Sequence, residues 1–203
     1  MFVVLDGIDG CGKTTQATRL VRALEAETGK ETLHLREPGS TRLGEALRAI
    51  LLAPGREISP AAEALLFAAA RRQMLDEIVA PALARGAHVV VERFHASTFA
   101  YQGVAGGLGE DLVLDLLERF AGAPRPDLVI VLDLSAEVAR GRRARESARA
   151  SDRIEDKGIG FQSQVAAGFR RYVARIERAV LVDASRPEDD VAASVLLEVR
   201  RAL

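Results

Sequence analysis

The stretch Gly7–Thr14 near the start of the sequence has the residue types and spacing of a phosphate-binding loop. Glycines hold its first and sixth positions and Lys13 and Thr14 follow at once, which fits the pattern G-x-x-x-x-G-K-[ST]. Glycines let the backbone N–H groups of such a loop wrap a β-phosphate. The pattern predicts that Lys13 bridges the β- and γ-phosphates of ATP and that the Thr14 hydroxyl ligates Mg²⁺. The predicted ATP-binding residues are Gly7, Ile8, Asp9, Gly10, Cys11, Gly12, Lys13, Thr14 and Thr15.

The segments on either side of this loop favour a strand before it and a helix after it. Residues 2–5 are an apolar run typical of a buried strand, and apolar side chains recur at helical spacing from Ala17 to Leu24. The first turn of such a helix adds partial positive charge beside a bound phosphate. An ordinary glycine turn is the alternative, and it does not require this order of strand, loop and helix.

The composition limits the kind of protein this is. The chain has 203 residues, which suffice for one α/β domain spanning 1–203. A formal net charge of −1 provides no overall field for nucleic acid or a membrane, so we expect neither as a partner. The single cysteine, Cys11, excludes an internal disulfide framework, and no apolar run approaches the roughly 20 residues of a membrane helix. We therefore expect a cytoplasmic protein.

Apolar runs separated by amphipathic stretches predict alternating strands and helices. The predicted strands are 2–5, 32–35, 87–91, 128–132 and 179–182. The predicted helices are 14–24, one after 41, a long one from Pro60 with a kink near Pro81, 97–102, 111–120, one from 135, 161–178 and one after Pro187, with 103–109 as a surface loop. This alternation predicts an α/β fold with a five-stranded parallel sheet and helices on both faces.

Every predicted strand ends at charged residues. These are Asp6, Arg36, Glu37, Glu92, Arg93, Asp133 and Asp183. Because the carboxyl ends of parallel strands meet along one edge, we expect these residues to surround a single crevice, which is where such folds bind ligands.

Short motifs along nearly the whole chain resemble those of thymidylate kinases (dTMP kinases), a family of P-loop nucleoside monophosphate kinases. The phosphate-binding loop alone indicates only nucleotide binding. The more specific pieces are Arg36-Glu37-Pro38-Gly39, Ala100-Tyr101-Gln102-Gly103 and Asp152-Arg153-Ile154-Glu155. The resemblance implies a three-layer P-loop NTPase fold, transfer of the γ-phosphoryl group of ATP to dTMP to give dTDP and ADP, a requirement for Mg²⁺, and a homodimer.

The resemblance also implies which residues are catalytic. The family's bacterial type lacks an arginine in the phosphate-binding loop, as residues 8–11 do here, and a mobile lid at about 140–157 supplies it instead. An arginine there stabilises charge on the oxygens of the transferred phosphoryl group. The candidates are Arg153 first, Arg149 second and Arg145 third, and Lys13 and Arg93 complete the predicted catalytic set. A charge run of this kind, judged by composition alone, is typical of a solvated helix face.

The residues implied for the acceptor dTMP come from several segments. Phe67 and Arg71 lie four residues apart on one predicted helix, so the ring could stack on the base while the guanidinium bonds its edge. Helical spacing alone favours a core phenylalanine and a surface arginine. Arg48 and Arg93 are implied as clamps on the acceptor phosphate, although a lone Arg48 fits a solvated helix face. The full predicted set is Asp9, Glu37, Arg48, Phe67, Arg71, Arg93, Ser97, Thr98, Tyr101 and Gln102.

Three residues of that set have narrower implied roles. Asp9 is implied near the sugar 3′-OH, with a loop-stabilising Asx turn as the alternative. Tyr101 is implied near the 2′ position, where it favours deoxyribose. Glu37 is implied to organise the side that holds the acceptor phosphate.

Thr14 and Glu92 form the predicted metal site. Family members usually have an aspartate before the strand-end arginine, which orders the Mg²⁺ shell through water. Glu92 keeps that charge and adds one methylene, which Mg²⁺ tolerates when water fills the gap. An exposed strand-end acid is the alternative. The three histidines have no metal-ligand spacing.

Two other functions remain open from the sequence. One is another nucleotide or nucleoside kinase on the same scaffold, acting for instance on dUMP or a nucleoside. The other is a P-loop switch or motor ATPase, which the implied acceptor residues and the lack of a long extra domain disfavour. Turnover with a panel of monophosphates separates these possibilities.

Overall fold

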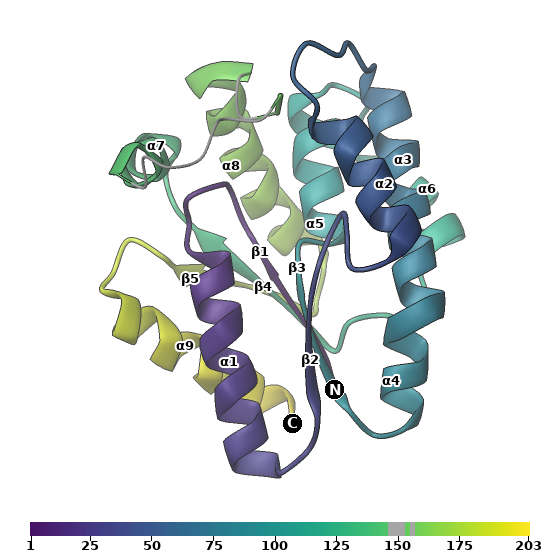
Figure 1. Ribbon diagram of the computed structural model, residues 1–203. Helices are drawn as coiled ribbons and strands as arrows, with labels where there is room; N and C mark the ends of the chain where they lie inside the picture. Colours follow the sequence, from purple (N-terminus) through teal and green to yellow (C-terminus); the bar gives the residue numbers. More distant parts are fainter. Residues whose placement is uncertain (146–152, 155–156) are drawn as a thin grey trace.

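The computed structural model describes residues 1–145, 153–154 and 157–203 (Figure 1). Within them, five parallel strands form one sheet in the order β2-β3-β1-β4-β5. The strands are β1 (Phe2–Asp6), β2 (Thr32–Arg36), β3 (His88–Glu92), β4 (Leu128–Asp133) and β5 (Ala179–Asp183). The five-stranded parallel sheet predicted from the sequence is therefore confirmed.

Burial follows the position of each strand in the sheet. The central strands β1, β3 and β4 are apolar and buried along almost their whole length, because helices cover both faces of a parallel sheet. The edge strands β2 and β5 contain exposed positions as well. Because β1 pairs with β3 and β4 in parallel register, the residues that follow these three strands lie side by side at one edge.

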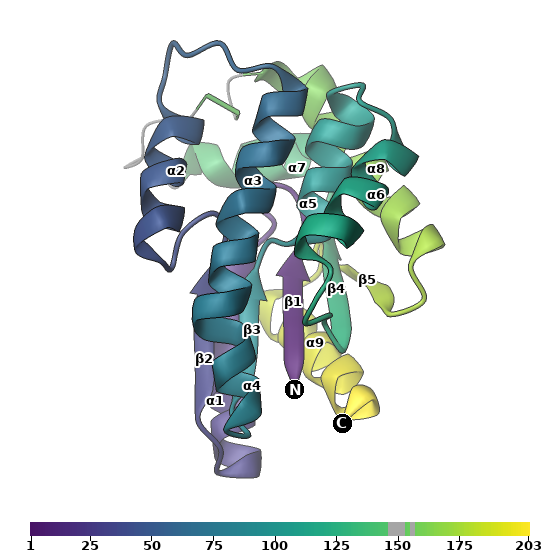
Figure 2. The same cartoon turned by 90° about the vertical axis from the view of Figure 1, so that its right-hand side faces the viewer.

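Helices form a layer on each side of the sheet. They are α1 (Lys13–Thr28), α2 (Arg42–Leu52), α3 (Pro60–Met74), α4 (Ala80–Ala84), α5 (His95–Thr98), α6 (Glu110–Ala121), α7 (Ala136–Arg145), α8 (Gly158–Arg175) and α9 (Glu188–Ala202), with π-helical segments η1 (Leu75–Val79) and η2 (Phe99–Ala105). Figure 1 shows α1 and α9 together on one side of the sheet and α4 on the other. Helices α2, α3 and α6 stand side by side above the strand ends in Figure 2.

The predicted kink at Pro81 takes the form of a π-helical segment. Helix α3, η1 and α4 run on without interruption, and the Ala80 N–H bonds to the Leu75 carbonyl five residues earlier. Proline lacks the N–H that would bond four residues back, so a wider turn before it keeps the segment helical.

The prediction of a surface loop at 103–109 was partly wrong. Residues 103–105 belong to η2, and Gly103 is buried against Val113 of α6. Glycine content signalled a loop, whereas the first three of these residues continue a helical segment. Among the described helices, none is both long and apolar enough to cross a membrane.

Helix α8 packs closely on η2 at Gly168. A Cβ atom at this position would lie 2.9 Å from Ala100 Cα and 3.2 Å from Val104 Cβ. Gly160, in the same helix, has nothing within 4 Å of such an atom. The contact at Gly168 holds in place the segment that contains Tyr101 and Gln102.

Replacing these two glycines by alanine should have opposite effects on stability. Alanine favours a helix by about 1 kcal/mol relative to glycine, so Gly160→Ala should raise the free energy of unfolding by up to that amount. In Gly168→Ala the overlap with Ala100 should outweigh the gain and lower the free energy of unfolding by about 1–2 kcal/mol. Urea unfolding of both variants measures this difference. An equal rise in the free energy of unfolding for both variants would contradict the prediction, because it would show that η2 can move away from α8.

Candidate active site

The phosphate-binding loop is held closed by its own lysine. Lys13 Nζ donates to the carbonyl oxygens of Gly7 and Ile8, each at 2.9 Å, and the side chain is buried. Gly12 adopts a left-handed conformation (φ 96°) at the first turn of α1. A Cβ on Gly10 would lie 2.7 Å from the Ala139 carbonyl oxygen, so α7 passes directly over the loop. Gly12 therefore allows a positive φ, and Gly10 allows the close approach of α7.

The buried carboxylate of Asp6 joins this loop to the end of β3. One oxygen accepts hydrogen bonds from the Gly7 N–H at 2.9 Å and the Ser97 hydroxyl at 2.6 Å. The other accepts from the N–H groups of Phe94 and Ser97, both at 3.0 Å. With four donors on two oxygens, Asp6 has a fixed structural task at the centre of the site and is a poor candidate for a metal ligand.

Arg93 and Asp9 form an ion pair at this junction. Arg93 has a positive φ of 67°, and its guanidinium contacts Asp9 and donates to Ser97 Oγ at 3.1 Å. The Tyr101 hydroxyl donates to the second oxygen of Asp9 at 3.3 Å. Burial alone would raise the pKa of Asp9, but the charges of Arg93 and Lys13 outweigh it and hold that pKa well below its usual range. Asp9 is therefore an ionised acceptor facing the site.

A second buried ion pair, Arg71 with Glu37, lies deeper in the molecule. Arg71 is 1% exposed; its Nε donates to Glu37 at 2.8 Å, and its Nη2 contacts Glu37, the Phe94 carbonyl oxygen and Thr98 Oγ1. The surface position that helical spacing favours for Arg71 is therefore wrong. Its Nη1 is buried and has no hydrogen-bond partner among the described residues. That nitrogen is a donor available to a ligand.

All ten residues predicted for the acceptor line one cavity of about 580 Å³. They are Asp9, Glu37, Arg48, Phe67, Arg71, Arg93, Ser97, Thr98, Tyr101 and Gln102, joined by Pro38, Leu52 and Ile154. The lining combines apolar side chains, including the ring of Phe67, with the donors and acceptors described above. A flat molecule with one polar edge fits such a cavity.

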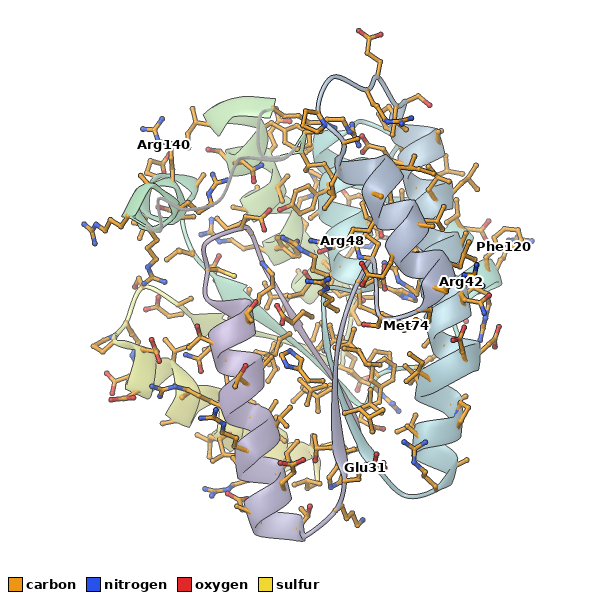
Figure 3. The ribbon with its side chains drawn as sticks, in the orientation of Figure 1. Glu31, Arg42, Arg48, Met74, Phe120 and Arg140 are labelled. Carbon is orange, nitrogen blue, oxygen red and sulfur yellow. The ribbon has the colours of Figure 1, made fainter. Side chains whose placement is uncertain are left out.

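A larger cleft of about 1310 Å³ lies over the phosphate-binding loop. It is lined by Gly10, Gly12, Lys13, Thr14, Thr15, Arg36, Glu92 and Arg143 together with Asp9, Glu37, Arg48 and Arg93. The last four residues also line the smaller cavity. Figure 3 shows Arg48 reaching from α2 toward the centre of the molecule. Two ligands, one in each space, would therefore meet at a wall that contains two arginines.

Comparison with known proteins matches this arrangement to one family. A family model described as thymidylate kinase matches residues 5–195. A protein named thymidylate kinase from Synechococcus sp. (strain RCC307) is 44% identical over 209 residues, covering 100% of this chain and 96% of the relative. Another of that name from Pelotomaculum thermopropionicum is 42% identical over 204 residues, covering 100% and 94%. The chain belongs to the thymidylate kinase family.

The arginines that the thymidylate kinase resemblance assigned to the lid lie in different surroundings. Arg153 Nη1 donates to Glu63 at 2.6 Å and its Nε to the Leu51 carbonyl oxygen at 2.9 Å, so it is bound to α3 and the end of α2. Arg153 does not line the cleft over the phosphate-binding loop. Arg149 lies outside the described residues, and Arg145 is exposed at the end of α7.

Among the described residues of α7, it is Arg143 that lines the cleft. Its Cγ lies 3.0 Å from where a Cβ on Gly10 would stand. Arg140 points outward into solvent in Figure 3, and Arg142 donates to the Ala184 carbonyl oxygen at 2.8 Å. Sequence reasoning gave a solvated helix face as the alternative for this charge run and did not single out Arg143. The signal it missed is that the helix starts directly after β4 and must therefore pass over the loop.

Glu92 lies between the phosphate-binding loop and β2. The Thr14 hydroxyl donates to Glu92 Oε2 at 2.7 Å, and His34 Nε2 lies 2.8 Å from Oε1. The Glu92 side chain is only 12% exposed, so the alternative interpretation of an exposed strand-end acid is wrong. Burial raises the pKa of Glu92, and the hydrogen bonds from His34 and Thr14 more than compensate, so the net pKa lies below the ordinary value.

This donor set fits the Mg²⁺ site that family members share with other P-loop enzymes. The Thr14 hydroxyl directs its proton to Glu92, which leaves its oxygen lone pairs available to a cation. No cluster of three or more histidine, cysteine, aspartate or glutamate side chains is present in the part of the chain that is described. A Mg²⁺ ion held by one hydroxyl, phosphate oxygens and water needs no such cluster.

Several residues of the site were not found by sequence reasoning. His34 and Glu63 contact predicted residues across long sequence separations, and Ile154 joins the wall of the acceptor cavity. His95 stacks on Phe94 and its Nε2 lies 2.9 Å from the Ala121 carbonyl oxygen. Burial lowers the pKa of His95 to about 3, so this ring stays neutral and has a structural task.

Proposed function

We propose that this protein transfers the γ-phosphoryl group of ATP to the 5′-phosphate of dTMP, giving dTDP and ADP. The observation that carries the proposal is the wall shared by the acceptor cavity and the cleft over the phosphate-binding loop. Membership of the thymidylate kinase family supports the same reaction. Because ATP is the co-substrate, we place the reaction in the cytoplasm.

The chemistry requires positioning and charge stabilisation more than a strong base. The backbone N–H groups of the loop bind the β-phosphate, and Lys13 exchanges the carbonyl oxygens it now contacts for phosphate oxygens. Arg48 and Arg93 face both spaces, so they contact the acceptor phosphate and the phosphoryl group as it moves. Their charges stabilise the oxygens on which negative charge accumulates.

A third arginine, supplied from the α7 side of the cleft, completes this arrangement. Arg143 is already placed there, and Arg149 keeps the role that the resemblance implies. Arg153 remains a predicted catalytic residue, and to reach the phosphates it would have to leave Glu63 and Leu51.

The acceptor cavity presents a donor and an acceptor to the base. Arg71 Nη1 is the available donor and suits the O4 carbonyl of thymine. The Gln102 amide lines the cavity close by and can accept from the N3–H. The Phe67 ring stacks on the base, and Tyr101, bonded to Asp9, limits space beside the sugar. Cytosine has the opposite pattern at both positions and fits poorly.

Mg²⁺ would be held by Thr14 directly and by Glu92 through water, as the hydroxyl-to-carboxylate bond suggests. Bound there, the ion would neutralise charge on the β- and γ-phosphate oxygens. Glu92 and His34 keep the Thr14 hydroxyl oriented for this task.

We also propose a homodimer formed through α2, α3 and α6. These neighbouring helices carry exposed large apolar side chains, namely Leu43, Ile50, Leu65, Leu112 and Phe120. On α2, Leu51 is buried within this chain, whereas Leu43 and Ile50 are exposed. A second copy of the same surface, related by two-fold symmetry, would cover them.

The dimer can be tested by changing one residue on this surface and one elsewhere. Leu65→Arg should shift the sedimentation coefficient from dimer to monomer at micromolar concentration, because it places a charge in an apolar interface. Leu197→Arg, on α9, changes a similarly exposed leucine and should leave the dimer intact. A wild-type protein that sediments only as a monomer would contradict the proposal.

The reaction can be tested by coupling ADP formation to a panel of acceptors. We expect dTMP to give the highest kcat/KM, dUMP to be weaker by about 10-fold because it lacks one methyl group, and dCMP and thymidine to be poor. Lys13→Met should lower kcat by roughly 10²-fold or more, and Lys30→Met, at an exposed turn, should have no effect. ADP release that does not depend on any acceptor would identify a P-loop ATPase instead.

The role of Glu92 can be tested by a magnesium titration. Glu92→Gln removes the charge and should lower kcat roughly 10- to 100-fold and raise the Mg²⁺ concentration needed for half-maximal rate. Glu92→Asp should keep substantial activity, because it retains the carboxylate. Glu31→Gln, at the opposite end of the sheet in Figure 3, is the matched control. Normal turnover by Glu92→Gln at all Mg²⁺ concentrations would exclude this carboxylate from the metal site.

A further inference from the structure

Glu63 is a buried carboxylate that connects the acceptor cavity to Arg153 and Lys157. It lies in the first turn of α3 and is 1% exposed. Its Oε2 accepts from Gln102 Nε2 at 2.8 Å. Its Oε1 accepts from Arg153 Nη1 at 2.6 Å and from Lys157 Nζ at 3.3 Å. Neither motif matching nor helical spacing pointed to this residue.

The contact with Glu63 determines which end of the Gln102 amide faces the cavity. A glutamine side chain presents two N–H donors on one branch and a carbonyl acceptor on the other, and an ionised carboxylate can only accept. The NH₂ group must therefore face Glu63, and the carbonyl oxygen occupies the other branch. Because Gln102 lines the acceptor cavity, it presents an acceptor to the same space that the unpaired donor of Arg71 lines.

The same carboxylate also holds Ile154 at the cavity. Arg153, the preceding residue, is fixed between Glu63 and the Leu51 carbonyl oxygen, and Gln162 Nε2 donates to the Ile154 carbonyl oxygen at 3.3 Å. These contacts place Ile154, 7% exposed, in the apolar part of the cavity wall. One side chain therefore contacts both Gln102 and the residue that precedes Ile154, and Gln102 and Ile154 both line the cavity.

We propose that Glu63 is a positioning residue that sets base selectivity, by fixing the Gln102 carbonyl oxygen toward the base and anchoring the segment that contains Ile154. The proposal rests on the proposed function, since it concerns the same acceptor cavity. It assigns to Glu63 the preference for a base with a donor at N3 and an acceptor at O4 over one with the reverse pattern.

Glu63→Gln tests this with little change in shape. A glutamine at this position can donate or accept, so the Gln102 amide becomes free to turn over. We expect the ratio of kcat/KM for dTMP to that for dCMP to fall about 10- to 100-fold, which corresponds to one charged hydrogen bond. Part of the change should be a rise in KM for dTMP. Glu77→Gln, an exposed acid on η1, is the matched control and should leave the ratio unchanged.

A swapped pair separates this role from simple support of the fold. In Glu63→Gln with Gln102→Glu, residue 63 donates and residue 102 keeps an acceptor oxygen toward the cavity, so the ratio should recover at least in part. Affinities for thymidine and deoxycytidine, measured by calorimetry, report the same selectivity without turnover. Where the single variant does not fold, Glu63→Gln with Arg153→Gln removes both buried charges together and should still lose selectivity.

The outcomes separate this proposal from the proposed function. A wild-type protein that does not phosphorylate dTMP would contradict the function itself. Wild-type activity together with a folded Glu63→Gln variant whose dTMP-to-dCMP ratio and nucleoside affinities are unchanged would overturn the role of Glu63 alone. Equal losses for both bases would also overturn it, because they indicate structural support without selection.

Discussion

The site depends on the carboxylate of Asp6, which is fully buried at the end of the central strand. Its four hydrogen bonds fix the start of the phosphate-binding loop against the turn that follows β3. Burying a carboxylate costs free energy unless hydrogen bonds compensate for the lost water. The four donors to Asp6 provide that compensation. Asp9 follows the loop residue that Asp6 binds, and Arg93 directly precedes Phe94, so this group fixes the backbone on either side of their ion pair.

Two arginines of the acceptor cavity are held by carboxylates before any ligand arrives. Arg93 is paired with Asp9 and Arg71 with Glu37, and each pair contains further hydrogen bonds to backbone or hydroxyl groups. Buried ion pairs of this kind contribute little to stability and are often replaceable by apolar residues without loss. Their value lies in preorganisation, because each guanidinium keeps a fixed direction and does not have to be ordered by the substrate.

Sequence reasoning worked where a local pattern determines the outcome. Continuous apolar runs identified the strands, the glycine spacing identified the loop, and the motifs after β2 and β3 identified residues that now line one cavity. It did not find pairs such as His34 with Glu92, which join two strands through side-chain direction. It also misjudged residues 103–105, because glycine content signals a loop although these residues continue the π-helical segment η2.

The sequence also did not determine which long side chains of a helix face the site and which face solvent. Arg143 and Arg140 are three residues apart on α7, yet one faces the cleft and the other faces solvent. The face of α7 that meets the site depends on how this helix crosses the phosphate-binding loop. That crossing is set by the folded sheet and cannot be derived from the helix sequence alone.

The shared wall has a thermodynamic consequence. A group that contacts both substrates cannot respond to one without altering its interaction with the other, and such coupling between two binding equilibria is reciprocal. Asp9, Glu37, Arg48 and Arg93 line both spaces, so two ligands bound there would share them. The factor by which bound nucleotide would change the affinity for the acceptor equals the factor by which bound acceptor would change the affinity for the nucleotide. Binding of either substrate would therefore change the affinity for the other through these four side chains.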